Sequence, residues 1–239
     1  MTECTIISLS ESALLISFGN EINLQLHDEV MKAKKLIEEM KFEGFIETVP
    51  AYNSLAVYYN PLLIEQKEKT IALTVEKKIR EILNGNNPTI KQSGNQTQMI
   101  IPVCYDDEFG IDLDELSQAL QLSKEEIIQL HSSRTYKVFM TGFTPGFPYM
   151  GILDEKLITK RKTQPRLKVD AGAVAIAGNQ TGIYPSATPG GWNIIGRTPL
   201  KLLDTTKANP FLLKAGDEVK FEVITKDEFE NYAPSDALV

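Results

Sequence analysis

One stretch of the chain, residues 141–198, constrains the fold more strongly than any other. It holds nine of the fifteen glycines and the only tryptophan, together with several prolines and aromatic residues. Glycine permits a positive φ and a close approach of the backbone to a ligand, whereas proline fixes φ at about −65°. A segment that fixes its backbone so tightly while carrying aromatic and hydrogen-bonding side chains is more typical of a binding surface than of a core.

Short apolar runs bounded by Gly, Pro, Asp or Asn make up most of the second half of the chain. We expect strands at residues 99–103, 134–140, 173–177, 192–195, 200–203 and 219–224, and short helices at residues 112–120 and from 123 to about 131. Ser123 and Glu126 have the spacing of a capping box. Many short strands with two small helices predict a β-barrel or a rolled sheet. The acidic end, residues 227–239, predicts a frayed tail.

The first half predicts a separate, smaller domain with the element order β-β-α-β-β-α. Its strands are expected at residues 5–8, 13–18, 45–49 and 55–59, and its helices after Asn20, a candidate cap, and from about residue 63 to 83. His27 lies beside the apolar stripe of the first helix, which predicts a partly exposed side chain without a catalytic role. A polar stretch at residues 91–98 is typical of a linker, so we place the domains at residues 1–90 and 91–239.

The composition excludes several classes of function. A net charge of −7 works against binding the phosphate backbone of a nucleic acid, which requires a basic surface. Two cysteines are too few for a disulfide framework. The two histidines lie far from both cysteines in the sequence, without the spacing of metal ligands, so we expect no metal site. No apolar run reaches the roughly 18–20 residues that span a bilayer, and the N-terminus lacks a secretion signal. We therefore expect a cytoplasmic protein with neither nucleic acid nor a membrane as its partner.

Two motifs that could carry chemistry are weak. Residues 191–198, Gly-Trp-Asn-Ile-Ile-Gly-Arg-Thr, match the spacing of a phosphate-binding P-loop with arginine in place of lysine. Their interior is strand-like and Pro199 follows at once, so we reject a P-loop there. His131 is the only weak candidate for a catalytic acid–base group in the second domain, and a helix-end cap fits its position equally well. No nucleophile elbow or zinc-protease motif is present.

The remaining candidates could line a binding groove with aromatic walls and a few fixed polar groups. They are Phe143, Pro145, Gly146, Phe147, Tyr149, Arg166, Gln180, Thr181, Tyr184, Pro189, Gly190, Gly191, Trp192 and Arg197. Arg166 and Arg197 are suited to binding a carboxylate or a backbone carbonyl. For Phe143 and Phe147, packing in the core is an equally open alternative. Such residues bind and orient but supply no nucleophile, which favours a binding or accessory component over a complete enzyme.

Several long motifs in fixed order resemble one family. They are residues 143–151 (Phe-Thr-Pro-Gly-Phe-Pro-Tyr-Met-Gly), residues 171–185 (Ala-Gly-Ala-Val-Ala-Ile-Ala-Gly-Asn-Gln-Thr-Gly-Ile-Tyr-Pro), residues 188–192 (Thr-Pro-Gly-Gly-Trp) and residues 50–55 (Pro-Ala-Tyr-Asn-Ser-Leu). The family is that of the 5-oxoprolinase B subunit, also called KipI or allophanate hydrolase subunit 1. The resemblance implies an α+β N-terminal domain followed by a mainly-β, cyclophilin-like barrel domain.

The resemblance also implies a function shared with other chains. Such a protein works with a companion, the KipA-like C subunit, and with a third subunit to convert the lactam 5-oxoproline to glutamate. ATP is used by the complex, and we expect no cofactor bound by this chain itself. Two alternatives within the resemblance stay open. One is a KipI-type inhibitor of histidine kinase autophosphorylation, and the other is a subunit of a biotin-dependent urea carboxylase or allophanate-type carboxyltransferase.

Overall fold

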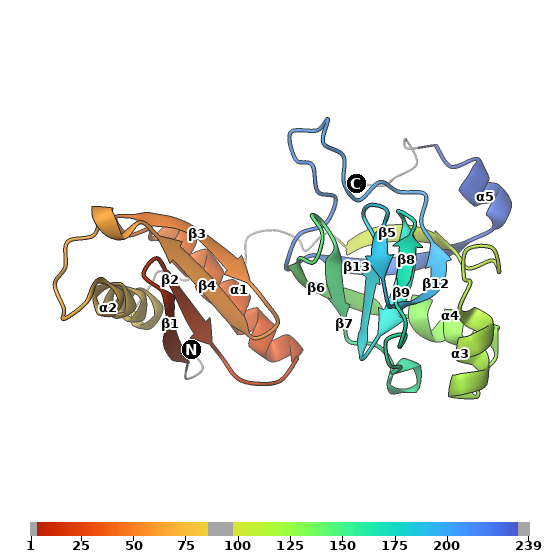
Figure 1. The fold of residues 1–239 in the computed structure, drawn as a ribbon, viewed down its shortest axis with the longest axis horizontal. Coiled ribbons are helices and arrows are strands. Elements are labelled where there is room, and N and C mark those ends of the chain that lie inside the picture. Colours follow the sequence, from red (N-terminus) through yellow and green to blue (C-terminus); the bar gives the residue numbers. More distant parts are fainter. Residues whose placement is uncertain (1–3, 86–97, 234–239) are drawn as a thin grey trace. The chain divides into compact units, whose positions relative to one another are not determined.

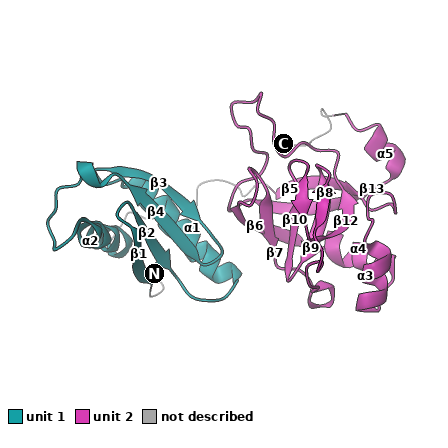
Figure 2. Cartoon of the chain, in the orientation of Figure 1, with its two compact units in different colours: residues 1–94 teal, residues 95–239 magenta. Residues whose placement is uncertain are grey.

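The computed structural model (Figure 1) describes residues 4–85 and 98–233. The chain divides into two compact units, residues 1–94 and residues 95–239, which are coloured separately in Figure 2. The predicted boundary between residues 90 and 91, and the predicted linker as far as residue 97, lie outside the described residues.

The first unit is a four-stranded antiparallel sheet covered by two helices. Its elements are β1 (Thr5–Ser10), β2 (Ala13–Ser17), α1 (Leu24–Glu39), β3 (Phe45–Pro50), β4 (Ser54–Tyr59), a 3₁₀ turn η1 (Pro61–Leu63) and α2 (Ile71–Asn84). The strands pair in the order β1-β2-β4-β3. Alternate residues of β4, namely Leu55, Val57 and Tyr59, are buried in one cluster with side chains of both helices. The predicted order β-β-α-β-β-α is therefore confirmed, with both helices on one face of the sheet.

Three local predictions for this unit are wrong. The cap of α1 is Asn23, whose side chain accepts the backbone N–H of Gln25, and not Asn20. The second helix begins at Ile71 because the side chain of Thr70 accepts the N–H of Leu73 there and caps it. His27 is buried, since it lies three residues before Val30 on the apolar face of α1, and its Nδ1 is 3.3 Å from the carbonyl oxygen of Ala51.

The second unit is a closed seven-stranded barrel, as predicted. Its elements are β5 (Gln98–Cys104), α3 (Leu113–Leu120), α4 (Lys124–Ser132), β6 (Thr135–Thr141), β7 (Pro148–Gly151), η2 (Glu155–Leu157), β8 (Arg166–Val169), β9 (Ala173–Ala177), β10 (Gln180–Ile183), β11 (Thr188–Gly190), β12 (Asn193–Arg197), β13 (Glu218–Ile224) and α5 (Lys226–Glu230). The barrel order is β10-β7-β6-β13-β5-β12-β9, and β8 and β11 pair with each other in a separate ribbon.

Strand β9 separates two clusters of buried residues. Val174 and Ile176 belong to the large barrel core, which also receives Leu113 and Leu116 from α3. The alternate residues of β9 are all alanines and belong to a second cluster together with Val169 of the β8–β11 ribbon. Because successive side chains of a strand point to opposite faces, the second cluster lies on the other face of the barrel wall. The small alanines leave room there for large aromatic rings.

The structure corrects several element predictions in this unit. Residues 200–203 form no strand and contribute only an isolated bridge between Leu203 and Phe211. The first residues of the predicted tail, 227–230, belong to helix α5, because Thr225 and Glu228 make a complete capping box. Strands β7, β8, β10 and β11 were not predicted. The capping box of Ser123 with Glu126 is confirmed.

Two further findings concern the described residues only. None of their helices is long and apolar enough to cross a membrane. They contain no group of three or more His, Cys, Asp or Glu side chains placed to hold a metal ion.

Candidate functional site

An aromatic cluster forms where the predicted groove residues meet. The ring of Phe147 makes edge contacts with four others, at centroid distances of 5.8 Å to Phe143, 4.9 Å to Tyr149, 5.2 Å to Tyr184 and 5.4 Å to Trp192. These rings come from the loop before β7, from β7 itself and from the segments that flank β11. The sequence motifs therefore do converge in space, on the outer face of β9.

Most of this cluster is packed and closed. Phe147, Tyr184 and Trp192 are at most 5% exposed, so they fill a core between the barrel wall and the ribbon. Phe143 is 63% exposed and has a φ of +67°, with the N–H of Thr144 donating to the carbonyl oxygen of Gly142 across it. Of the two open alternatives, Phe147 takes the core position and Phe143 the exposed one. The ring faces of the three buried residues are not available as walls of an open groove.

The glycine pair after Pro189 has two different environments. A Cβ atom on Gly190 would lie 2.3 Å from the hydroxyl oxygen of Tyr184, whereas a Cβ on Gly191 would have no neighbour nearer than 3.6 Å. Tyr184 is buried against Phe147 and cannot move aside.

Gly190→Ala is therefore expected to lower the free energy of unfolding by about 1–3 kcal/mol, the usual cost of overpacking. The adjacent substitution Gly191→Ala is a matched control that should stay near the wild-type value, because its contacts are of ordinary van der Waals length. Urea unfolding curves of both variants would measure the difference. Equal midpoints for the two variants would show that the packing around Tyr184 is looser than described.

The other predicted groove residues have mainly structural contacts. Gly146, which follows Pro145 in the loop before β7, has a φ of +82°. The ring of Phe211 occupies the space beside its Cα. Gln180 and Thr181 are buried on β10. The Arg197 Nε donates to the carbonyl oxygen of Ala171 over 3.0 Å, so this arginine does hold a carbonyl, but one of its own chain.

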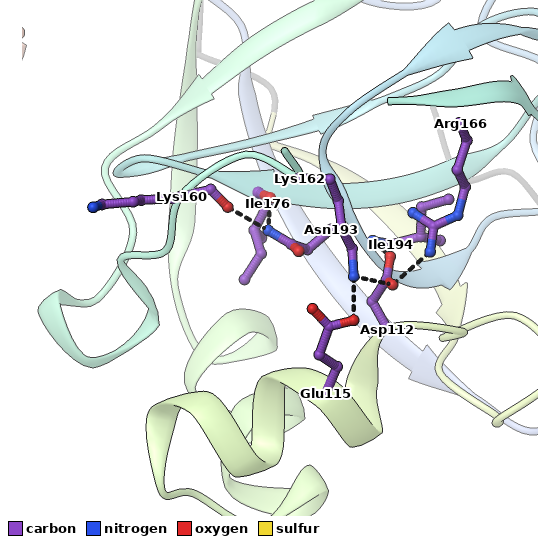
Figure 3. Close-up of polar contacts among 8 residues, drawn as sticks. All are labelled: Asp112, Glu115, Lys160, Lys162, Arg166, Ile176, Asn193 and Ile194. Atoms are coloured by element: carbon purple, nitrogen blue, oxygen red, sulfur yellow. Dashed lines mark hydrogen bonds and ion pairs between the residues drawn. The ribbon is translucent and has the colours of Figure 1, made fainter. Parts of the chain in front are cut away.

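A buried carboxylate at the start of α3 organises the neighbouring polar region (Figure 3). Asp112 is 2% exposed, and its Oδ1 accepts from Arg166 Nη2 over 2.6 Å and from Lys162 Nζ over 2.8 Å. Its Oδ2 accepts the backbone N–H of Ile194 over 2.7 Å. Burial alone would raise the pKa of the Asp112 carboxyl, but these three donors outweigh it and hold the pKa below its usual range. Lys162 also pairs with Glu115, which is 72% exposed.

Arg166 binds a carboxylate of its own chain, that of Asp112, and its predicted role toward a ligand stays a prediction. Sequence reasoning missed both Asp112 and Lys162. From the sequence, Asp112 is expected only to begin a helix, whereas in the structure its side chain makes no cap hydrogen bond.

A cavity of about 240 Å³ lies beside this ion cluster. It is lined by residues of α3, β12 and the loop that precedes β8, namely Glu115, Leu116, Ala119, Thr159, Lys160, Arg161, Lys162, Thr163 and Asn193. The side-chain amide of Asn193 donates to the carbonyl oxygens of Lys160 (2.9 Å) and Ile176 (3.3 Å), and so ties the loop to the barrel wall. The Arg161 guanidinium lies 5.8 Å from the ring centroid of Trp192, and so joins the cavity to the aromatic cluster.

None of the cavity residues was among the predicted site residues. The available signal was the run Lys160-Arg161-Lys162, three adjacent cations in a chain of net charge −7. The cavity offers charged and amide groups that bind and orient, and no activated nucleophile among its described lining residues.

His131 is fully buried in the barrel core and does not line this cavity. Its Nδ1 lies 2.8 Å from the Tyr105 hydroxyl oxygen, and its Nε2 lies 2.8 Å from Thr181 Oγ1. Thr181 donates its own hydroxyl proton to the carbonyl oxygen of Ala175, so Nε2 carries the ring proton and Nδ1 accepts from Tyr105. The alternative of a helix-end cap is wrong, because both ring nitrogens bond to side chains of other elements. Burial lowers the pKa of His131 from 6.5 to about 3, which keeps the ring neutral.

Comparison with known proteins gives consistent results. Residues 4–213 match the family model described as "Carboxyltransferase domain, subdomain C and D". The chain is 42% identical to the B subunit of 5-oxoprolinase from Bacillus subtilis over 94% of each chain. It is 34% identical to the protein of the same name from Escherichia coli O157:H7, over 89% of this chain and 93% of the relative.

Among solved structures, the fold is similar to that of TTHA0988, with a TM-score of 0.76 and 32% identity. That match covers 89% of this chain but only 40% of the other, so this chain spans less than half of that larger protein.

Proposed function

Because the chain belongs to the family of the 5-oxoprolinase B subunit, we propose that it is one subunit of a complex that hydrolyses 5-oxoproline to glutamate with consumption of ATP. The observation that carries this proposal is the 42% identity over 94% of both chains with a protein of that name. An identity that extends over both units favours a shared role for the whole chain. A cytoplasmic location is part of the same proposal.

The structure favours a subunit that binds and positions a ligand over a subunit that performs the chemistry alone. Opening a lactam requires an activated carbonyl and an attacking group. The histidine of the barrel is neutral and closed off from the cavity. The polar side chains of the cavity are two ammonium groups, a guanidinium, a carboxylate, a carboxamide and two hydroxyls, and groups of these kinds hold and orient a ligand. We therefore propose that the KipA-like companion and a third subunit supply the remaining groups.

The test is reconstitution with the companion subunits encoded by the same organism. The complete complex is expected to release glutamate from L-5-oxoproline only when ATP is present. The same mixture without this chain should release none, and addition of the purified chain should restore the activity. Full activity in the mixture that lacks this chain would contradict the proposal.

The family description favours one second candidate, a carboxyltransferase subunit of a biotin-dependent carboxylase. The relatives called urea amidolyase are 21–22% identical, which supports the fold alone. Carboxyl transfer from a carboxylated biotin carrier protein to urea, measured with the same complex, would distinguish the two. Inhibition of a histidine kinase stays a prediction, to be measured as slower autophosphorylation in the presence of the purified chain.

A further inference from the structure

We propose that the cavity between α3, β12 and the loop at residues 159–163 binds the substrate of the complex, a small lactam that carries a carboxylate, and that Arg161 holds this carboxylate. The proposal rests on the proposed function for the identity of the ligand. It adds the place of binding and the residues that recognise the ligand.

Four cations border the ion cluster and the cavity, namely Lys160, Arg161, Lys162 and Arg166, and the last three differ in what they already bind. Lys162 and Arg166 both donate to Asp112. Arg161 is exposed and has no carboxylate partner among the described residues. Its guanidinium is positioned by the ring of Trp192, so part of the entropy cost of ordering it is met before a ligand arrives. A guanidinium presents paired N–H groups that match the two oxygens of a carboxylate. Arg161 is thus placed to bind an anion.

Asn193 supplies the complementary acceptor. Both hydrogens of its side-chain amide are used, toward the carbonyl oxygens of Lys160 and Ile176, which fixes the plane of the amide. Its Oδ1 accepts no hydrogen bond from the described part of the chain, and the residue lines the cavity. A carbonyl oxygen held in this way suits a donor such as the ring N–H of a lactam.

The remaining wall and the size of the cavity fit a small ring. Leu116 and Ala119 of α3 give one side of the cavity an apolar surface against which methylene groups can pack. Its volume of about 240 Å³ is below the roughly 300–1,000 Å³ of pockets for drug-sized ligands. A cyclic amide with a carboxylate on the carbon next to its nitrogen has all three features: an anion for Arg161, an N–H donor for Asn193 and methylene groups for the apolar side of the cavity.

The only tryptophan of the chain provides a direct readout of binding, because Arg161 lies over its ring. Titration of the purified full chain with L-5-oxoproline is expected to change the Trp192 fluorescence to saturation. The lactam 2-pyrrolidinone lacks the carboxylate and should bind about ten- to a hundredfold more weakly, the usual effect of losing a charge-assisted hydrogen bond. Equal apparent affinities for the two lactams would overturn the assignment of the carboxylate to Arg161.

Variants in the reconstituted complex separate this inference from the proposed function. Arg161→Gln should raise the KM for L-5-oxoproline about tenfold or more, with a smaller effect on kcat, because the arginine binds the substrate and not the reacting bond. Lys168→Gln makes the same change of charge on an exposed side chain of β8, and its KM should stay within about twofold of wild type. If the wild-type complex is active and Arg161→Gln has an unchanged KM, the cavity is not the substrate site although the proposed function stands. If the wild-type complex does not hydrolyse 5-oxoproline at all, the proposed function itself is wrong.

Discussion

Asp112→Ala is expected to lower the free energy of unfolding of the barrel unit by about 3 kcal/mol. The substitution removes the carboxylate with which Lys162 and Arg166 both form ion pairs, and it leaves the buried N–H of Ile194 without its acceptor. Removal of one partner from a buried ion cluster costs about 3–5 kcal/mol in general. We expect the lower end of that range because the two cations are 16% and 29% exposed and regain part of their hydration.

The measurement is denaturant unfolding followed by the fluorescence of Trp192, which lies in the barrel unit and is buried in the folded state. Asp112→Asn keeps an acceptor for the Ile194 N–H but removes the charge, so its stability should fall between wild type and alanine. Glu108→Ala is the control for loss of a surface carboxylate, because Glu108 pairs with Lys226 on the surface, and it should leave the transition midpoint nearly unchanged. A midpoint for Asp112→Ala equal to that of the control would show that the ion cluster adds nothing to stability.

Much of the fold could be predicted from local patterns. The helices of the first unit follow from apolar residues at helical spacing, and the longer strands β5, β6 and β13 follow from apolar runs. The strands that were missed are short, and β10 reads Gln-Thr-Gly-Ile, which has no apolar pattern of its own. It is a strand because it lies between β7 and β9, and pairing with these two strands satisfies the hydrogen-bonding groups of its backbone. Closure of the barrel fixes such segments, and a local pattern does not contain that information.

The candidate site was predicted in part, for a similar reason. The aromatic residues of the Gly- and Pro-rich stretch do meet, as their clustering in sequence suggested. Their burial depends on the alanines of β9, which leave space for the rings. Asp112 pairs with Arg166 across 54 residues, and no spacing rule relates two such positions. His27 was predicted to be partly exposed because polarity favours exposure, but it is buried. The contacts of His131 were not predicted, since hydrogen bonds from distant elements offset the cost of burying it.

The stability of the barrel unit should fall with pH below about 6.5 because of His131. The folded protein holds this ring neutral, with a pKa of about 3, whereas the unfolded chain binds a proton with the ordinary pKa of 6.5. Between these two values the unfolded state carries more protons, so acidification favours unfolding, by up to about 1.4 kcal/mol per pH unit. Above about pH 6.5 the ring is neutral in both states and contributes no pH dependence.

The experiment compares His131→Gln with Tyr105→Phe by denaturant unfolding at several pH values from 7 to 4. Glutamine can still donate toward Thr181 and accept from Tyr105 but does not titrate, so the pH slope of this variant should be smaller than that of wild type by up to about 1.4 kcal/mol per pH unit. Tyr105→Phe removes the hydroxyl from His131 Nδ1 but keeps the ring, so it should lose stability at every pH and retain the wild-type slope. Groups such as Asp112, whose folded pKa is lowered, also lose their contribution on acidification, but they do so equally in all three proteins. The difference in slope therefore isolates the histidine, and equal slopes for His131→Gln and wild type would mean that His131 is protonated inside the barrel.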